Sequence, residues 1–189
     1  MGFFRRRVSL GIAGLLAVFF TGGLALAGVQ WGAHQTNTVE FCTSCHEMRD
    51  NNYAEYKDTI HARNHAGVKA VCSDCHVPHD PMGMVLRKIG AAKDVYAHVL
   101  GNIDTPDKFQ AHRLEMATEV WRRMKTTDSA ECRHCHDVKA MDWAQQGTTA
   151  RKQHEKIGKN GKTCIDCHYG IAHTEPAGGL EPSDVVGGS

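Results

Sequence analysis

Hydrophobic residues are concentrated in the first thirty positions of the chain, and the rest of the sequence has few apolar runs. Arg5, Arg6 and Arg7 precede an uncharged stretch that covers residues 8–30. An apolar stretch of about 20 residues is long enough for a helix to cross a bilayer. Positive charge ahead of such a stretch favours a cytoplasmic N-terminus and an exported remainder. We therefore predict a cytoplasmic segment over residues 1–7 and a transmembrane anchor over 8–30.

A cleaved signal peptide is the alternative interpretation of this segment. Ala25-Leu26-Ala27 offers a small-residue cleavage site, but the apolar stretch is longer than the roughly 7–15 residues of a signal-peptide core. A retained single-pass anchor is therefore favoured. Four glycines in the segment would let a second helix pack closely, which makes a homodimer an alternative to a monomer. These glycines are Gly11, Gly14, Gly22 and Gly23.

Beyond the anchor, apolar residues recur at helical spacing in two segments. The first runs from Pro81 to Leu100, and the second surrounds Trp121. Between them, Asp104 or Thr105 can cap the second helix, with Pro106 in its first turn. The apolar positions are Val85, Ile89, Ala92, Tyr96 and Val99 in the first segment, and Leu114, Ala117, Trp121 and Met124 in the second.

The composition of the 189-residue chain excludes two broad classes of protein. With a net charge of +1 and 41% hydrophobic residues, it is neither a strongly basic nucleic-acid binder nor a disordered chain. Eight cysteines and thirteen histidines are unusual for this length, and all eight cysteines belong to four Cys-x-x-Cys-His motifs. The motifs are Cys42-Thr-Ser-Cys45-His46, Cys72-Ser-Asp-Cys75-His76, Cys132-Arg-His-Cys135-His136 and Cys164-Ile-Asp-Cys167-His168.

Each motif is typical of covalent attachment of haem c. The two thiols bond to the haem, and the adjacent histidine becomes an axial ligand of the iron. Zinc sites also use paired cysteines, but zinc does not require a histidine directly after each second cysteine. Disulfides are the other alternative in an exported chain. The histidine follows in four motifs out of four, which favours haem and predicts four haem c groups.

The motif spacing divides the exported part into two halves. The first cysteines of successive motifs are 30, 60 and 32 residues apart. We predict a first dihaem module with an interfacial helix over 31–100, a helical connection over 101–130, a second dihaem module over 131–175 and a flexible tail over 176–189. Four haems would fill much of the interior, so we expect a mainly α fold with long loops and little or no β-sheet.

Nine histidines outside the motif positions are candidates for the second axial ligands. Four recur at matching places in the two halves: His61 and His154 precede the second and fourth motifs, and His79 and His173 follow them. His65 and His112 are reserves. The remaining three are less favoured, because His134 lies inside a motif and because His34 and His98 have no counterpart in the other half.

The first motif continues with a methionine that could compete for the iron. Met48 lies two residues beyond His46, and methionine ligation raises the potential of a haem relative to two histidines. The alternative is that Met48 only packs against the porphyrin.

The segment from Pro81 to Leu100 combines an apolar face with Arg87, Lys88 and Lys93. Such a helix can lie at a bilayer surface with its basic residues toward the lipid head groups. Asp94 on the same helix could accept a proton from a quinol that gives up electrons. A solvated charged face is the other interpretation of these residues.

Further segments accompany the motifs: Glu40-Phe41, Glu47-Met48-Arg49, Val77-Pro78-His79, Ile103-Asp104-Thr105-Pro106, Ala111-His112-Arg113-Leu114, Trp121-Arg122-Arg123-Met124 and Gly170-Ile171-Ala172-His173. With them, the chain resembles the NapC/NirT family of tetrahaem quinol dehydrogenases from the anchor to about His173. The resemblance implies oxidation of menaquinol or ubiquinol at the outer face of the inner membrane. It also implies a periplasmic reductase as electron acceptor: a nitrate reductase with a dihaem subunit, or alternatively a nitrite or trimethylamine oxide reductase.

The same resemblance implies roles for individual residues. Met48 takes the place of a ligand of haem 1 and competes with His46, and Asp94 with Arg87 and Lys88 takes the place of a quinol site. His61, His154 and His173 are implied as ligands of haems 4, 2 and 3, and His79 stays open. Two other functional classes remain: a passive haem relay, and a terminal reductase with an open coordination position on one haem.

Overall fold

The computed structural model describes the backbone of residues 2–157 and 161–187, and the side chains from residue 11 onward within these ranges. The predicted cytoplasmic arginines at positions 5–7 therefore lie outside the described side chains. The chain forms two compact units, Met1–Asn37 and Thr38–Ser189, and each is described by itself.

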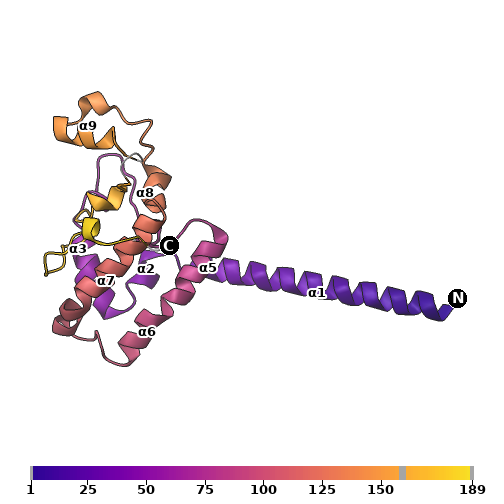
Figure 1. Ribbon diagram of the computed structural model, residues 1–189. Coiled ribbons are helices and arrows are strands. Elements are labelled where there is room, and N and C mark those ends of the chain that lie inside the picture. Colours follow the sequence, from indigo (N-terminus) through magenta and orange to yellow (C-terminus); the bar gives the residue numbers. More distant parts are fainter. Residues whose placement is uncertain (1, 158–160, 188–189) are drawn as a thin grey trace. The chain divides into compact units, whose positions relative to one another are not determined.

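The first unit is the helix α1, Gly2–Gln35 (Figure 1). Its segment Gly11–Gln35 is 25 residues long, has a mean hydropathy of 2.1 and has none of its window buried. A straight helix rises 1.5 Å per residue, so this segment is long enough for a hydrocarbon core of roughly 30 Å. The apolar helix predicted over 8–30 is present and continues five residues further, to Gln35.

The second unit contains helices joined by loops, and its described residues form no strand. This agrees with the predicted mainly α fold with long loops. Its elements are α2 (Val39–Cys42), a π-helical turn (Met48–Tyr53), α3 (Ala54–Tyr56), α4 (Cys72–His76), α5 (Pro81–Gly90), α6 (Ala92–Val99), α7 (Pro106–Thr126), α8 (Ala130–Cys135), η2 (Trp143–Gln145), α9 (Thr148–His154), η3 (Cys164–Asp166) and η4 (Pro182–Asp184).

The long helix α7 organises the second unit (Figure 1). The Thr105 hydroxyl accepts a hydrogen bond from Lys108 N at its start, and Pro106 occupies the first turn, where a missing N–H costs nothing. Its buried face carries Phe109 and Arg113 in one half and Trp121 and Met124 in the other. Spacing close to multiples of 3.6 puts these four side chains on one side of the helix.

We expect Thr105→Ala to lower the free energy of unfolding by about 1 kcal/mol, because the cap of α7 is lost. Chemical denaturation of the purified protein, followed by circular dichroism, measures the change. Thr105→Ser keeps the hydroxyl and is the matched control, with an expected change of a few tenths of a kcal/mol at most. Equal losses in the two variants would contradict a capping role for the hydroxyl.

The buried apolar core is small for a unit of this size. Among the described residues it consists of Tyr56, Met84, Phe109, Trp121, Met124, Ile165 and Val185. Large apolar side chains of the same unit stay exposed, including Ile60, Val68 and Val99. Protein interiors are close-packed, so a core this sparse fits a fold whose interior is completed by bound cofactors.

Two segments differ from the sequence-based expectation. The helix expected over Pro81–Leu100 is divided into α5 and α6 at Ala91, directly after Gly90, a residue that weakens helices. In the predicted flexible tail, residues 180–185 instead pack on α7: Val185 joins Trp121 in the core, and Lys125 Nζ donates to the Pro182 carbonyl at 2.8 Å. This contact was not predicted, because the tail has little apolar content.

Candidate haem-binding sites

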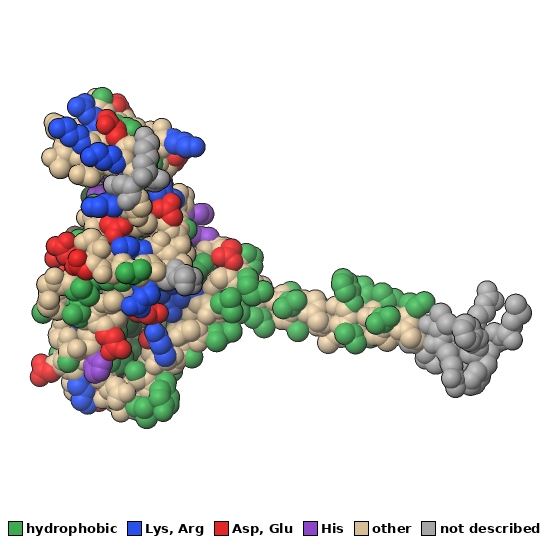
Figure 2. All heavy atoms as spheres, in the orientation of Figure 1, with side chains coloured by type: hydrophobic (Ala, Val, Ile, Leu, Met, Phe, Trp, Pro, Cys, Tyr) green, Lys and Arg blue, Asp and Glu red, His purple; other side chains and the backbone are tan. Residues whose placement is uncertain are grey.

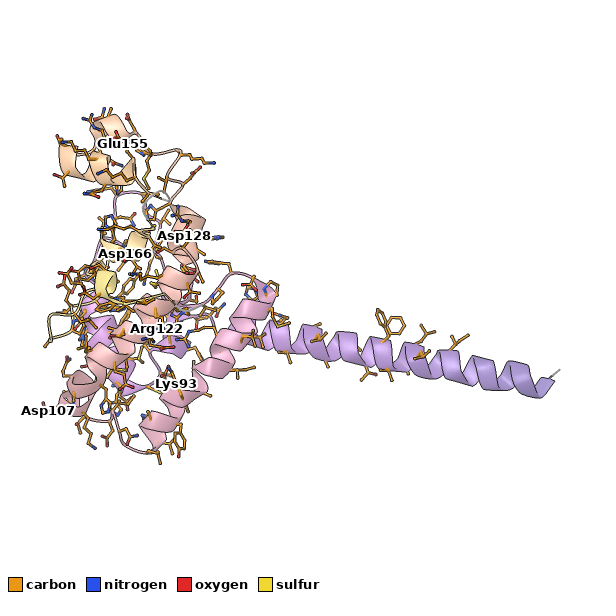
Figure 3. All side chains as sticks on the ribbon, in the orientation of Figure 1. Lys93, Asp107, Arg122, Asp128, Glu155 and Asp166 are labelled. Carbon is orange, nitrogen blue, oxygen red and sulfur yellow. The ribbon has the colours of Figure 1, made fainter. Side chains whose placement is uncertain are left out.

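Short helical turns carry the four motifs. In the second and fourth motifs an aspartate precedes the second cysteine and fixes the turn locally. Asp74 accepts from Val71 N, and Asp166 accepts from Thr163 N, both at 2.7 Å. Asp166, shown in Figure 3, also pairs with Lys125 Nζ of α7 at 2.9 Å. Burial alone would raise the pKa of Asp166, but these contacts hold it below its usual value. The turns thus present both thiols and the histidine of a motif from a rigid backbone.

Every motif histidine faces a second histidine from elsewhere in the chain. The ring centroids of the four pairs lie 5.9–6.1 Å apart. Metal–imidazole bonds are roughly 2 Å long, so an iron bound between two imidazoles would hold their ring centres about 6 Å apart. This spacing fits a haem iron held between the two rings of a pair, although in the first pair Glu47 Oε1 lies between the rings, 2.5 Å from Nδ1 of His98 and 3.5 Å from Nε2 of His46. The pairs are His46 with His98, His76 with His173, His136 with His61, and His168 with His154.

Three of the histidines predicted as second ligands lie in such pairs, but their partners differ from those that the family resemblance implied. His61 faces His136 of the third motif rather than the fourth. His173 faces His76 of the second motif rather than the third. His154 faces His168 of the fourth motif rather than the second, because α9 ends ten residues before that motif.

His79 is not opposite a motif histidine. Its ring is exposed and stacks on His134, with centroids 3.8 Å apart and planes inclined by 12°. The apparent repeat that paired His79 with His173 therefore does not extend to their positions in the fold. The two reserves also lie at the surface: His65 is exposed, and the exposed His112 has its Nδ1 3.0 Å from the Lys108 carbonyl oxygen.

His98 was less favoured because it has no counterpart in the second half, and it is the histidine that lies opposite His46. His98 lies four residues after Asp94 on α6, so helical geometry puts both side chains on the same face.

Met48 has a side chain that is 40% exposed, and its sulfur accepts a hydrogen bond from Asn52 Nδ2 at 3.5 Å.

Consecutive motifs are neighbours in space. The thiols of Cys42 and Cys72 are hydrogen-bonded, which lowers the pKa of Cys42 to about 7. Those of Cys132 and Cys164 are also hydrogen-bonded, which lowers the pKa of Cys164 to about 6. Helix α4, which carries the second motif, contacts α2 and also α8, which carries the third. The four motifs thus follow one another in chain order, from the first to the fourth.

A buried ionic network lies beside the second motif's pair. Arg113 donates to both carboxylate oxygens of Glu55, at 2.8 and 2.5 Å, and to the Thr174 carbonyl at 2.7 Å. Thr174 N donates to Glu55 Oε2 at 2.9 Å. The contacts fix the backbone next to His173 and join α3, α7 and the segment after the fourth motif.

Two arginines near His76 lack partners for individual guanidinium atoms. Arg87 Nε and Arg123 Nη2 are buried without a hydrogen-bond partner in the described part of the chain. Burial and then the repulsion from Arg87 lower the pKa of Arg123. Burial, His173 and the two arginines together lower the pKa of His76 to about 3, so the imidazole is neutral, as a metal ligand must be. Two cations at this position suit the carboxylates of haem propionates.

The residues predicted for a quinol site are distributed along α5 and α6. Lys88 lies near Cys42 of the first motif, with Nζ 5.8 Å from the centre of the Phe41 ring. Burial lowers the pKa of Lys88. Arg87 acts instead on His76 of the second motif. Asp94 is exposed on α6. Figure 2 shows apolar side chains at the surface of α5 and α6. Leu86, Ile89 and Val99 are exposed apolar residues of these helices.

Known cytochromes c are similar to this chain over most of its length. A family profile described as the N-terminal region of the NapC/NirT cytochrome c family matches residues 5–178. The cytochrome c-type protein NapC of Escherichia coli strain K12 is 50% identical over 171 residues, which cover 90% of this chain and 84% of that protein. A protein of Allochromatium vinosum described as a tetraheme c-type cytochrome is 48% identical over 170 residues, with 89% and 90% coverage. The denitrification system component NirT of Stutzerimonas stutzeri is 46% identical over 179 residues, with 94% and 88% coverage. No solved structure matches this chain.

Proposed function

Because the chain belongs to the NapC/NirT cytochrome c family, we propose that it is a membrane-anchored tetrahaem quinol dehydrogenase. It would oxidise menaquinol or ubiquinol and deliver the electrons to a periplasmic reductase. The observation that carries the proposal is the set of four histidine pairs, each with one motif histidine, along four motifs that adjoin in chain order. When bound, each haem supplies one centre that takes up and releases one electron.

The membrane part of the proposal rests on two features of the chain. The uncharged span of α1 is long enough to anchor the protein, and the arginines before it favour a cytoplasmic N-terminus with the second unit in the periplasm. The exposed apolar residues of α5 and α6 suit the boundary between lipid and water, where a quinol can be reached. Lys88 and Asp94 lie on this pair of helices.

We assign proton transfer from the quinol to Asp94. A quinol loses two protons with its two electrons, and an exposed carboxylate at the lipid boundary can accept them in turn and pass them to water. Lys88 would hold a quinol oxygen near the first motif, where Phe41 limits the movement of its ammonium group. Arg87 would orient a haem carboxylate beside His76 rather than the quinol.

Reduction of the purified full-length protein by a quinol tests this function. In detergent, a reduced quinol analogue is expected to reduce the haems on a turnover timescale, followed by haem absorption. Dithionite defines complete reduction. If dithionite reduces the haems and the quinol analogue does not, the protein is not a quinol dehydrogenase and the passive relay is favoured.

The terminal acceptor is tested with the same preparation. Nitrate reductase with its dihaem subunit is the acceptor we propose, and the expected result is rapid reoxidation of the quinol-reduced haems when this reductase and nitrate are added. Nitrite reductase and trimethylamine oxide reductase with their substrates are the comparisons. Faster reoxidation by either of these would reassign the acceptor and leave quinol oxidation intact.

A further inference from the structure

Basic side chains are concentrated between the third and fourth motifs. Residues 137–163 join these two motifs and contain six basic and three acidic side chains, a formal charge of +3. The rest of residues 38–189 contains thirteen basic and eighteen acidic side chains, a formal charge of −5. Residues 47–71, which join the first motif to the second, have four side chains of each sign. The charge of the second unit is therefore polarised, and its positive part is one segment.

The positive segment lies at the surface of the second unit. Figure 2 shows Lys and Arg side chains gathered over α9, the helix on which Figure 3 labels Glu155. The potentials of like charges that lie close together add, and salt screens them beyond about 8 Å at physiological ionic strength. We call the exposed, described cations of this segment the basic surface: Lys139, Arg151, Lys152, Lys156 and Lys162.

The basic surface adjoins the fourth motif. Helix α9 ends at His154, whose ring faces His168 of that motif with the centroids 6.0 Å apart. Nδ1 of His154 lies 2.7 Å from Oε1 of Gln146, and α9 packs against the turn η2. These contacts hold the cations of α9 beside the last of the four motifs. A partner that binds here is therefore next to the haem site at which a path in chain order ends.

An anionic lipid surface and an acidic protein are the two partners that such a charge can attract. Binding to lipid needs apolar side chains that insert among the head groups. No large apolar side chain is exposed in the described part of residues 137–163, whereas α5 and α6 carry several. Figure 1 shows α6 and α9 at opposite ends of the second unit. With α5 and α6 at the lipid boundary, α9 points toward soluble partners, so an acidic protein is favoured.

We propose that the basic surface is the docking site for the electron acceptor of this chain, and that the acceptor presents an acidic face. The inference rests on the proposed function in that it requires electrons to leave at the fourth haem site. Each productive encounter passes one electron to the acceptor and leaves one haem oxidised. Charge complementarity of this kind raises the rate of encounter at low salt by about 10–10³-fold, so docking is fast without a long-lived complex.

Electron transfer to soluble proteins of opposite charge tests the basic surface. The full-length holoprotein in a non-ionic detergent is reduced with dithionite, freed of excess reductant and mixed with oxidised plastocyanin, an acidic copper protein. Stopped-flow absorption of the haems gives the rate of oxidation. Raising the ionic strength from about 20 mM to about 500 mM is expected to slow oxidation about tenfold, because salt screens the attraction. Oxidised mitochondrial cytochrome c, a basic protein, should show no slowing.

A double charge reversal locates the effect on α9. Lys152→Glu with Lys156→Glu is expected to lower the rate with plastocyanin about tenfold at low salt and to remove most of its salt dependence. The matched control is Lys108→Glu with Arg122→Glu on α7, at side chains that are 50% and 45% exposed. It changes the net charge equally and should alter the rate less than about twofold. Pyridine haemochrome gives the number of haems in each variant. If the first variant loses haem, Lys156→Gln carries the test, with an expected decrease of about twofold.

Several outcomes would overturn the docking site. Equal rates in the two double variants are one, and a rate with plastocyanin that rises with ionic strength is another. The lipid alternative is measured by hydrogen exchange of the protein in nanodiscs. Protection of the α9 amides with phosphatidylglycerol but not with phosphatidylcholine would assign the basic surface to lipid. Dithionite supplies the electrons in every rate measurement, so this inference and quinol oxidation fail independently.

Discussion

Replacing Asp94 by Asn is expected to slow reduction of the haems by quinol by about 10²–10⁴-fold, the usual contribution of a general base. Asparagine has the same shape but does not accept the proton that the quinol releases. Asp94 is exposed on α6, one helical turn before His98, so the substitution leaves no buried group unpaired. Stopped-flow absorption of the haems after mixing with a reduced quinol measures the rate.

The matched control for this prediction is Asp107→Asn, at an exposed carboxylate in the first turn of α7. It removes the same charge, but it lies outside α5 and α6. Dithionite should reduce both variants completely. Equal quinol rates in Asp94→Asn and the unaltered protein would remove Asp94 from the quinol site and support a passive relay.

Glu55→Ala is expected to lower the free energy of unfolding by about 3–5 kcal/mol, because it leaves a buried guanidinium without its carboxylate. The side chains of Arg113 and Glu55 are only 10% and 24% exposed. The variant also removes the acceptor of Thr174 N, next to His173. Chemical denaturation of the haem-loaded protein measures the loss.

A surface pair on the same helix provides the control. Glu119 and Arg122 are paired at 2.8 Å with side chains 52% and 45% exposed, and Figure 3 shows Arg122 on α7. Glu119→Ala should cost no more than about 1 kcal/mol. The double variant Glu55→Leu with Arg113→Met removes both buried charges and is expected to be more stable than Glu55→Ala alone. A small loss for Glu55→Ala would show that water reaches this arginine.

Local sequence patterns predicted the anchor, the helical class and α7, because each depends on the spacing of residues within one segment. Thr105 and Pro106, for example, begin α7 as their chemistry requires. The motifs likewise predict the attachment residues without reference to the fold. The chemistry of a site can therefore be predicted from the sequence when its residues lie within five positions of one another.

The pairing of ligands was not predictable in this way, because it depends on contacts between distant segments. His61 is seventy-five residues from His136, and His173 is ninety-seven from His76. The repeat favoured His154, whose ring faces His168 in the same half, and it also favoured His79, which lies at the surface and stacks on His134. The repeat did not favour His98, which lies opposite His46. A comparison of the two halves of a sequence carries no information on how α6 packs.

The contact between cysteines of successive motifs has a consequence for the maturation of this protein. Cys42 touches Cys72, and Cys132 touches Cys164. In an oxidising compartment, free thiols in contact close into disulfides. One such bond would consume a thiol from each of two motifs, so a single oxidation event blocks two attachments. Under the proposed export of this unit, haem attachment depends on reducing power as well as on haem supply, and a shortage of reductant is expected to remove haems two at a time.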